Sequence, residues 1–441
     1  MSEPVPRRSV LAAMAAGGLG WVAGCTSGGM PQAPGSTTGD SPMPVPSTDI
    51  PTATPTLDIR EFGLTGSGRI DDSLGMQRAL DEASSTLHAL TVPDGFQIGL
   101  AQPLVLPPLV TLIGSGQMIA LTQMPRMVTV PDLTRQAMIV GMTFTGGHLL
   151  TAEVIESDTG TSSLRIESCR MEQAPMGVNI RGGSSAVAVR GCRFDDVDVG
   201  VSLRGAVRSI EVSSSVFTTW RDRGIWIVGT ATAAPRQVRL DSNYFDPPSP
   251  GGKVRQPIQI NGDDAMLLQG VQVTNNVVHG TGTAFRDPAH PGAADLISLH
   301  RCSGFLVAGN TVEDGGDVGI TVSRQSVNGV VRNNTSRRNN TVGICIGSLE
   351  STRVTSITVT GNVCEDNGQD RLREAKPWNR AGVLVVHGQS VTVQGNTLAD
   401  TGGGTQRNGV AVVGSTVTLG PNEIVSPGPA LYSSASTVRR V

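Results

Sequence analysis

The fold is decided by the stretch Val271-Gln-Val-Thr-Asn-Asn276, in which apolar and polar residues alternate and an asparagine stands three positions after the second apolar residue. The same arrangement recurs at twelve places, which begin at Val110, Met138, Leu164, Val187, Ile210, Val238, Val271, Phe305, Gly329, Ile357, Val391 and Val417. The position of Asn276 is taken elsewhere by Thr143, Cys169, Cys192, Ser215, Asn243, Asn310, Asn334, Asn362, Asn396 and Asn422. Alternation of this kind indicates strands with one buried face. Because the shortest interval is 23 residues and longer ones add up to 11, the pattern predicts a constant coil that carries loops of different lengths.

Asparagine at seven successive corners has two physical uses. It tolerates a left-handed backbone at a bend, and its amide can hydrogen-bond to the same amide one coil away. Between the corners lies a second strand series, which starts at Gly177, Gly200, Gly224, Pro257, Leu296, Gly319, Gly343, Gly382 and Gly409. Two or three parallel strands per coil predict an all-β solenoid, a right-handed parallel β-helix of about ten to twelve coils.

The composition agrees with this fold. Gly supplies 55 of the 441 residues and aromatic residues only 3%, which argues against a mainly helical protein and against a core of large rings. A net charge of −3 provides no basic surface for nucleic acid. The cysteines and histidines form no zinc-type pair, so no metal site is predicted; the sequence leaves calcium, any other cofactor and the oligomeric state open.

One segment resembles a known superfamily. Residues 58–72 read Asp-Ile-Arg-Glu-Phe-Gly-Leu-Thr-Gly-Ser-Gly-Arg-Ile-Asp-Asp, and Gln77-Arg-Ala-Leu80 follows. This is similar to the N-terminal segment of pectate-lyase-like β-helix proteins of the rhamnogalacturonase type, as are Val92-Pro-Asp-Gly95 and residues 106–116. The resemblance implies a β-helix over residues 58 to about 425, with a capping helix from Ser73 to about Ser84. Asp71 and Asp72 would then cap that helix.

The N-terminus predicts export. Arg7-Arg8 precedes a short apolar stretch that ends in Val22-Ala-Gly-Cys25, which resembles a twin-arginine signal with a bacterial lipobox. Residues 1–25 would be the signal, with Cys25 lipidated after cleavage, and residues 26–56 a disordered Ser/Thr/Pro/Gly tether. We expect the single β-helix domain at 57–430 and a C-terminal tail at 431–441. The membrane contact would be the lipid anchor alone, on the extracytoplasmic face.

Outward-facing positions of the second strand series gather polar residues in the middle coils. One column runs through Asn179, Ser202, Trp226, Gln259, Ser298, Thr321, Cys345, Leu384 and Ala411, and the next through Arg181, Arg204, Val228, Asn261, His300 and Ser323. Insertions near residues 246–256, 279–295 and 367–381 precede neighbouring strands and are expected to turn this face into a groove. We therefore expect a substrate-binding set of Gln259, Asn261, Trp226, Trp378, Arg301 and Arg324, in which each tryptophan is either a sugar platform or loop packing.

Two chemistries fit the residues near these strands. Asp263 and Asp264, with Asp295 before the following strand, supply paired carboxylates of the kind that hydrolyse glycosides, unless they form an ordinary polar turn. His300 beside Arg301 and Arg324 suits elimination or epimerisation of a uronate, in which His300 would carry the proton near neutral pH. The sequence thus predicts an exported, lipid-anchored protein that binds and processes an extracellular or cell-wall polysaccharide. The alternative is a non-catalytic envelope module that binds a glycan or a protein.

Overall fold

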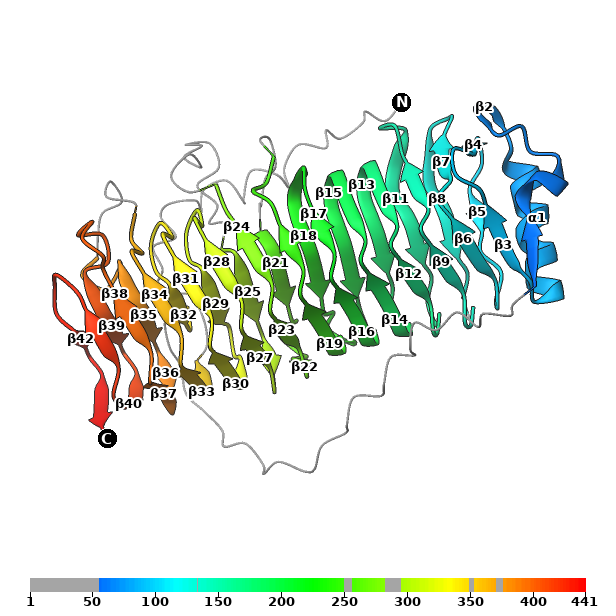
Figure 1. The fold of residues 1–441 in the computed structure, drawn as a ribbon. Helices are drawn as coiled ribbons and strands as arrows, with labels where there is room; N and C mark the ends of the chain where they lie inside the picture. The colour runs from blue at the N-terminus through cyan, green and yellow to red at the C-terminus, as the bar shows by residue number, and fades with distance from the viewer. Residues whose placement is uncertain (1–54, 133, 250–255, 282–294, 349–352, 370–375) are drawn as a thin grey trace, which may run out of the picture.

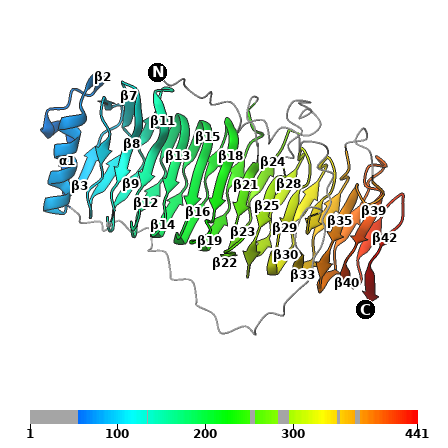
Figure 2. The same ribbon diagram turned by 180° about the vertical axis from the view of Figure 1, so that it is seen from behind.

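The computed structural model describes residues 55–132, 134–249, 256–281, 295–348, 353–369 and 376–441. The strands stack in parallel along a rod, with helix α1 (Ser73–Thr86) at one end and β42 near the other (Figures 1 and 2). The predicted parallel β-helix is therefore confirmed. Cys25 and nearly all of the predicted tether lie outside the described residues. No helix within the described ranges is long and apolar enough to cross a membrane.

Three stacks of strands run along the rod. The first stack is one sheet and contains β1 (Thr56–Asp58), β3 (Ala89–Val92), β6 (Thr111–Gly114), β9 (Met138–Val140), β12 (Arg165–Glu167), β14 (Ser185–Arg190), β16 (Arg208–Ser213), β19 (Arg236–Asp241), β22 (Leu268–Gln269), β23 (Gln272–Thr274), β26 (Cys302–Ser303), β27 (Leu306–Ala308), β30 (Val327–Arg332), β33 (Val354–Thr360), β36 (Gly388–Gln389), β37 (Val391–Gln394), β40 (Thr416–Leu419) and β43 (Thr437–Arg440).

The second and third stacks are joined because β13 (Arg170–Ile180) and β15 (Arg193–Arg204) run through both. The second stack otherwise contains β2 (Ser67–Asp71), β4 (Gln97–Leu100), β7 (Gln117–Ala120), β10 (Thr143–Thr145), β17 (Val216–Phe217), β20 (Tyr244–Phe245), β24 (Val277–His279), β28 (Thr311–Glu313), β31 (Thr335–Arg337), β34 (Val363–Glu365), β38 (Thr397–Ala399) and β41 (Glu423–Val425). The third stack otherwise contains β5 (Leu104–Val105), β8 (Met124–Val130), β11 (Leu150–Ser157), β18 (Trp220–Val228), β21 (Gln256–Asn261), β25 (Ile297–His300), β29 (Ile320–Ser323), β32 (Ile344–Ile346), β35 (Ala381–Val386), β39 (Asn408–Val413) and β42 (Leu431–Ser434).

The predicted asparagine ladder runs unbroken from Asn243 to Asn422. At each step the backbone N–H and the side-chain amide of one asparagine both donate to the side-chain oxygen of the next, at 2.8–3.0 Å. The predicted left-handed backbone is one residue earlier, for example at Asn275 and Asn333. The first corner also needs correction: Thr143 pairs with Arg170, so the counterpart of Cys169 is Met142.

Two of the earlier corners carry cysteines, Cys169 and Cys192, and both thiols are free and buried. Their Sγ atoms donate to carbonyl oxygens of the preceding coil, at 3.6 Å to Ile139 and 3.4 Å to Ile166. Polar corner side chains thus satisfy backbone groups that the bend removes from the strand ladders.

Glycine at the start of third-stack strands leaves room for the core. The rings of Phe194, Phe217 and Phe245 stack on one another, with centroids 4.8 and 4.4 Å apart. A Cβ atom on Gly200 would lie 2.4 Å from the ring of Phe217 and 2.7 Å from the carbonyl oxygen of Gly224. The glycines that recur at this position are therefore required by close approach and not by backbone flexibility.

Both ends of the domain differ in part from the prediction. Asp71 does act at the start of α1, because its Oδ1 accepts from the backbone N–H of Ser73 at 3.0 Å. Asp72 holds the N-cap position but makes no cap bond; its carboxylate accepts from the backbone and hydroxyl of Thr65 instead. Residues 431–441 are not a tail, since they supply β42 and β43, which pair with β39 and β40. These residues pair in parallel with the preceding coil, so the solenoid continues through them.

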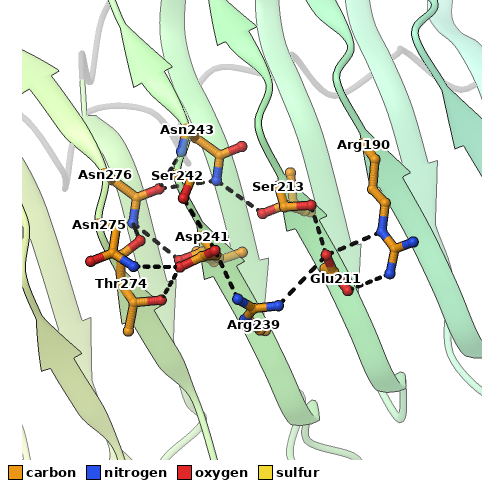
Figure 3. A network of polar contacts seen from close by, with 12 residues as sticks. Arg190, Glu211, Ser213, Arg239, Asp241, Ser242, Asn243, Thr274, Asn275 and Asn276 are labelled. Carbon is orange, nitrogen blue, oxygen red and sulfur yellow. Dashed lines mark hydrogen bonds and ion pairs between the residues drawn. The ribbon is translucent and has the colours of Figure 1, made fainter. Parts of the chain in front are cut away.

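The outer face of the first stack carries a chain of ion pairs. Arg190 binds Glu211 with two hydrogen bonds, at 2.7 and 3.1 Å, and Arg239 binds Asp241 at 2.8 Å (Figure 3). Arg239 also lies 3.8 Å from Glu211, so the pairs are continuous across three coils. Burial favours a raised pKa for Glu211, but the hydrogen bonds from Arg190 and Ser213 lower it below its usual value. The arginines and carboxylates of this chain therefore neutralise one another.

Candidate functional site

The outer face of the third stack holds the predicted polar columns, and their register is confirmed. Each residue of the column pairs with its counterpart on the next coil, in the order Asn179, Ser202, Trp226, Gln259, Ser298 and Thr321. The expectation that these residues face open solvent is wrong for several of them: Asn179 is 3% exposed and Ser298 0%. This face is therefore polar but largely buried.

Polar atoms along this column lack partners. Oδ1 of Asn179, Nε1 of Trp226, Oγ of Ser298 and Oγ1 of Thr321 are buried and have no hydrogen-bond partner among the described residues. Oε1 of Gln256, in the neighbouring column, is in the same state. Five steps of about 4.8 Å separate the coils of Asn179 and Thr321, so the column extends over about 24 Å. Buried polar atoms in native proteins are nearly always hydrogen-bonded to protein or to ordered water, so water or ligand groups would complete this row.

His300 ends β25 in the column beside this row. Its Nδ1 lies 2.6 Å from the hydroxyl oxygen of Ser323 on the next coil. Burial, followed by the positive charges of Arg324 and Arg301, lowers the pKa of His300 to about 3. The expectation that His300 titrates near neutral pH is therefore corrected: it is a neutral imidazole at pH 7.

The predicted carboxylates have separate roles. Asp264 is 81% exposed and forms an ion pair with Arg301. Asp263 accepts a hydrogen bond at 3.0 Å from the backbone of Ala265 within its own turn. Asp295 accepts one at 3.4 Å from the backbone of Val318 on the next coil. Asp264 is therefore linked to Arg301, the neighbour of His300, whereas Asp263 and Asp295 accept hydrogen bonds from backbone N–H groups.

The two predicted tryptophans lie in different surroundings. Trp226 is next to Gln259 in the column, and Arg223 donates a hydrogen bond from Nε to Gln259. Asn261 lies in register with His300 one coil further on. Trp378 instead packs beside Tyr432, with ring centroids 6.3 Å apart, against an apolar cluster that includes Leu384. Of the two uses weighed for Trp378, the structure shows packing.

A charged group at the N-terminal end of this face was missed. Glu153 and Glu156 on β11 are buried, and both contact Arg126 and Arg181, with Arg126 Nε 3.5 Å and Arg181 Nη2 4.0 Å from Glu153 Oε1. Burial raises the pKa of Glu153 although Arg126, Arg181 and Arg204 oppose it. The sequence contains a signal for Glu156, because this residue lies 23 residues before Asn179, which is the shortest interval between coils, and therefore belongs to the same column.

Much of the three predicted loops, at 250–255, 282–294 and 370–375, lies outside the described residues, so the expected groove stays a prediction. Within the described ranges, no group of three or more His, Cys, Asp or Glu residues could hold a metal ion.

Comparisons with known proteins agree with this geometry. A family model described as the right-handed β-helix region matches residues 253–398. The fold is a right-handed parallel β-helix. A comparison with curated proteins gives no significant match.

Three solved structures illustrate the likeness, and at their level of identity they show the fold alone. A surface adhesin of Streptococcus pneumoniae, PfbA, is 12% identical with a TM-score of 0.58, over 87% of this chain and 93% of its own. The tailspike protein of E. coli bacteriophage HK620, a double mutant in complex with a pentasaccharide, is 14% identical with a TM-score of 0.58, over 87% and 80%. The A-module of the Azotobacter vinelandii mannuronan C-5 epimerase AlgE4 is 13% identical with a TM-score of 0.50, over 87% and 99%.

Proposed function

We propose that the protein binds and processes an extracellular or cell-wall polysaccharide along the outer face of the third stack. The observation that carries this proposal is the polar column that runs in register from Asn179 to Thr321, with the more exposed Gln259, Asn261 and His300 in its middle coils. Sugar hydroxyls both donate and accept hydrogen bonds, so a saccharide chain laid along this face can bond to these amide and imidazole groups together. The pentasaccharide bound to the tailspike and the polymer named for the epimerase support a saccharide ligand on this fold.

The reaction that the cluster supports best is elimination or epimerisation at a uronate. Arg301 and Arg324 follow β25 and β29 at equivalent positions and can pair with a sugar carboxylate. His300 is unprotonated and can accept the C5 proton. A bound carboxylate would offset the two guanidinium charges that lower the pKa of His300, so the base would strengthen when substrate binds. In elimination the C5 electron pair forms a double bond to C4 as the C4–O bond breaks; in epimerisation a proton returns to the opposite face.

Glycoside hydrolysis by Asp263 and Asp264 is the less favoured reaction, because Asp264 is paired with Arg301. A non-catalytic envelope module is the second candidate. The observation in its favour is that Asp263, Asp264 and Asp295 all make contacts within the chain. We further propose export and lipidation at Cys25, which labelling with a fatty acid would test by comparison with a Cys25→Ser variant.

The test is a panel of polysaccharides incubated with the folded protein. Ultraviolet absorbance from an unsaturated sugar reports elimination, NMR reports epimerisation, and new reducing ends without absorbance report hydrolysis. We expect His300→Asn to abolish elimination or epimerisation and His88→Asn, at the distant cap, to keep it. Full activity in His300→Asn would overturn the assignment of the base, and binding without turnover would support the module.

A further inference from the structure

Trp226 lies under two arginines. The guanidinium carbons of Arg204 and Arg223 are each 4.4 Å from the centroid of its ring. Arg204 ends β15 on the preceding coil, and Arg223 lies on β18 with Trp226. Contacts of this kind stabilise a cation and hold both partners in place.

The polar contacts of these two arginines go to neutral groups, Arg204 Nε to Ser202 Oγ at 3.1 Å and Arg223 Nε to Gln259. Neither makes an ion pair with a carboxylate in the part of the chain that the structure describes. Burial and the nearby charge of Arg181 lower the pKa of Arg204 against the opposing charge of Glu153. Burial and Arg204 lower the pKa of Arg223 against the opposing charge of Asp222.

Two carboxylates on the same face are already engaged by other arginines. Glu153 and Glu156 contact Arg126 and Arg181, and Arg204 is the next cation along the face. On the first stack, by contrast, Arg190 and Arg239 both reach carboxylates. The arginines at Trp226 differ from these two because their hydrogen bonds go to neutral groups.

Unpartnered polar atoms surround the same ring. Asn179 Oδ1 belongs to the column of Trp226, two coils away, and its residue is only 3% exposed. Gln256 pairs with Arg223 in the sheet, and its Oε1 also lacks a partner among the described residues. The same is true of Nε1 of Trp226 itself. The surroundings thus offer two cations held against a ring, and both donors and acceptors.

We propose that Trp226, Arg204 and Arg223 form an anion-binding subsite that takes one acidic sugar unit, carrying a carboxylate or a sulfate. Trp226 would hold the two guanidinium groups in place while they bind the charged group of the sugar. The subsite lies two coils from His300, about 10 Å along the rod. This inference rests on the proposed function and narrows it: the substrate is a polymer with acidic units both at the reacting position and two coils away.

The test is calorimetric binding at low salt of three probes to the full chain: an oligogalacturonate, a chondroitin sulfate oligosaccharide and a neutral dextran oligosaccharide. Arg204→Gln and Arg223→Gln should each weaken binding of an acidic probe about tenfold, and reduce its salt dependence. The matched control is Arg208→Gln, an exposed arginine on the first stack, which should leave binding unchanged. Circular dichroism of each variant checks that it is folded. Tighter binding of the first or the second probe identifies the charged group.

Equal binding of the acidic and neutral probes, undiminished in both arginine variants, would refute the subsite. The proposed function would survive that result if Asn261→Ala, a change at a partly exposed residue outside the subsite, weakened binding of the same probes. Failure of all three probes to bind would count against the subsite and the proposed function together.

Discussion

Replacing Asn310 by alanine should destabilise the protein more than almost any other single change of a polar residue. Asn310 is in the middle of the ladder and fully buried. Its Oδ1 accepts from the backbone N–H and side-chain amide of Asn276, both at 2.9 Å. Its Nδ2 donates to the carbonyl oxygen of Val273 at 2.8 Å and to Asn334 Oδ1 at 2.9 Å.

The size of the loss follows from the groups left behind. In Asn310→Ala the backbone N–H of Asn276 and the carbonyl oxygen of Val273 lose these bonds inside the rod, where water has no access. Each buried polar group left unsatisfied costs about 1–3 kcal/mol, so we expect a loss of about 4 kcal/mol. A domain is stable by only about 5–15 kcal/mol, and the change should lower the unfolding midpoint markedly.

Two further variants should lose less stability than Asn310→Ala. Ser215 holds the equivalent position near the start of the ladder, where its hydroxyl accepts from the backbone N–H of Cys192 at 3.2 Å. Asn310→Ser should therefore keep one of the lost bonds and recover about half of the stability. Asn422→Ala, at the partly exposed end of the ladder, should cost about 1–2 kcal/mol because water can replace the amide.

Urea unfolding followed by circular dichroism measures all three variants, with the exposed Gln272→Ala as the control. The reasoning is refuted if Asn310→Ala loses less than about 1 kcal/mol, or if it equals Asn422→Ala. A change in the slope with urea would show that the coils on the two sides of Asn310 unfold separately, as solenoids can.

Three further predictions concern packing, charge and pH. Gly200→Ala should cost about 2–3 kcal/mol by thermal unfolding, because its Cβ would overlap the ring of Phe217; an unchanged midpoint would contradict this. Arg190→Met should cost about 2 kcal/mol by leaving the Glu211 carboxylate short of a partner, and a double-mutant cycle with Glu211→Gln should show coupling of about 1 kcal/mol rather than none. The pKa of His300 is lower in the folded state than in the unfolded state, so the folded protein binds fewer protons and its stability falls as pH drops from about 6.5 towards 3. His300→Asn should make this fall in stability less steep between pH 6.5 and 5. A stability profile identical to that of the unchanged protein would contradict the burial of His300.

The coil itself could be predicted because its determinants repeat in the sequence. Every ladder asparagine sits at the same offset from an alternating strand, so one short motif fixes strand, corner and register together. A second corner ladder, Asn339 to Asn367 to Gln406, was not predicted. It has three members at intervals of 28 and 39 residues, and its last member is glutamine, so no period marks it.

The site could be predicted only in part, for a physical reason. Polarity along the outward column can be read from the sequence, because side chains alternate along a strand. The protonation of His300 depends on Arg301 and Arg324, which come from two different coils, and on burial that no local pattern records. The same holds for Trp226, whose two arginines come from adjacent coils.

The two outer faces differ in a way that itself argues for function. On the first stack, Glu211 and Asp241 are satisfied by arginines and hydroxyls, and that face is complete as it stands (Figure 3). On the third stack, five buried polar atoms lack partners among the described residues. At about 1–3 kcal/mol each they would cost about 5–15 kcal/mol, as much as a whole domain is stable by. A scaffold that satisfies one face so fully can bear this deficit on the other only if ordered water or ligand groups satisfy it.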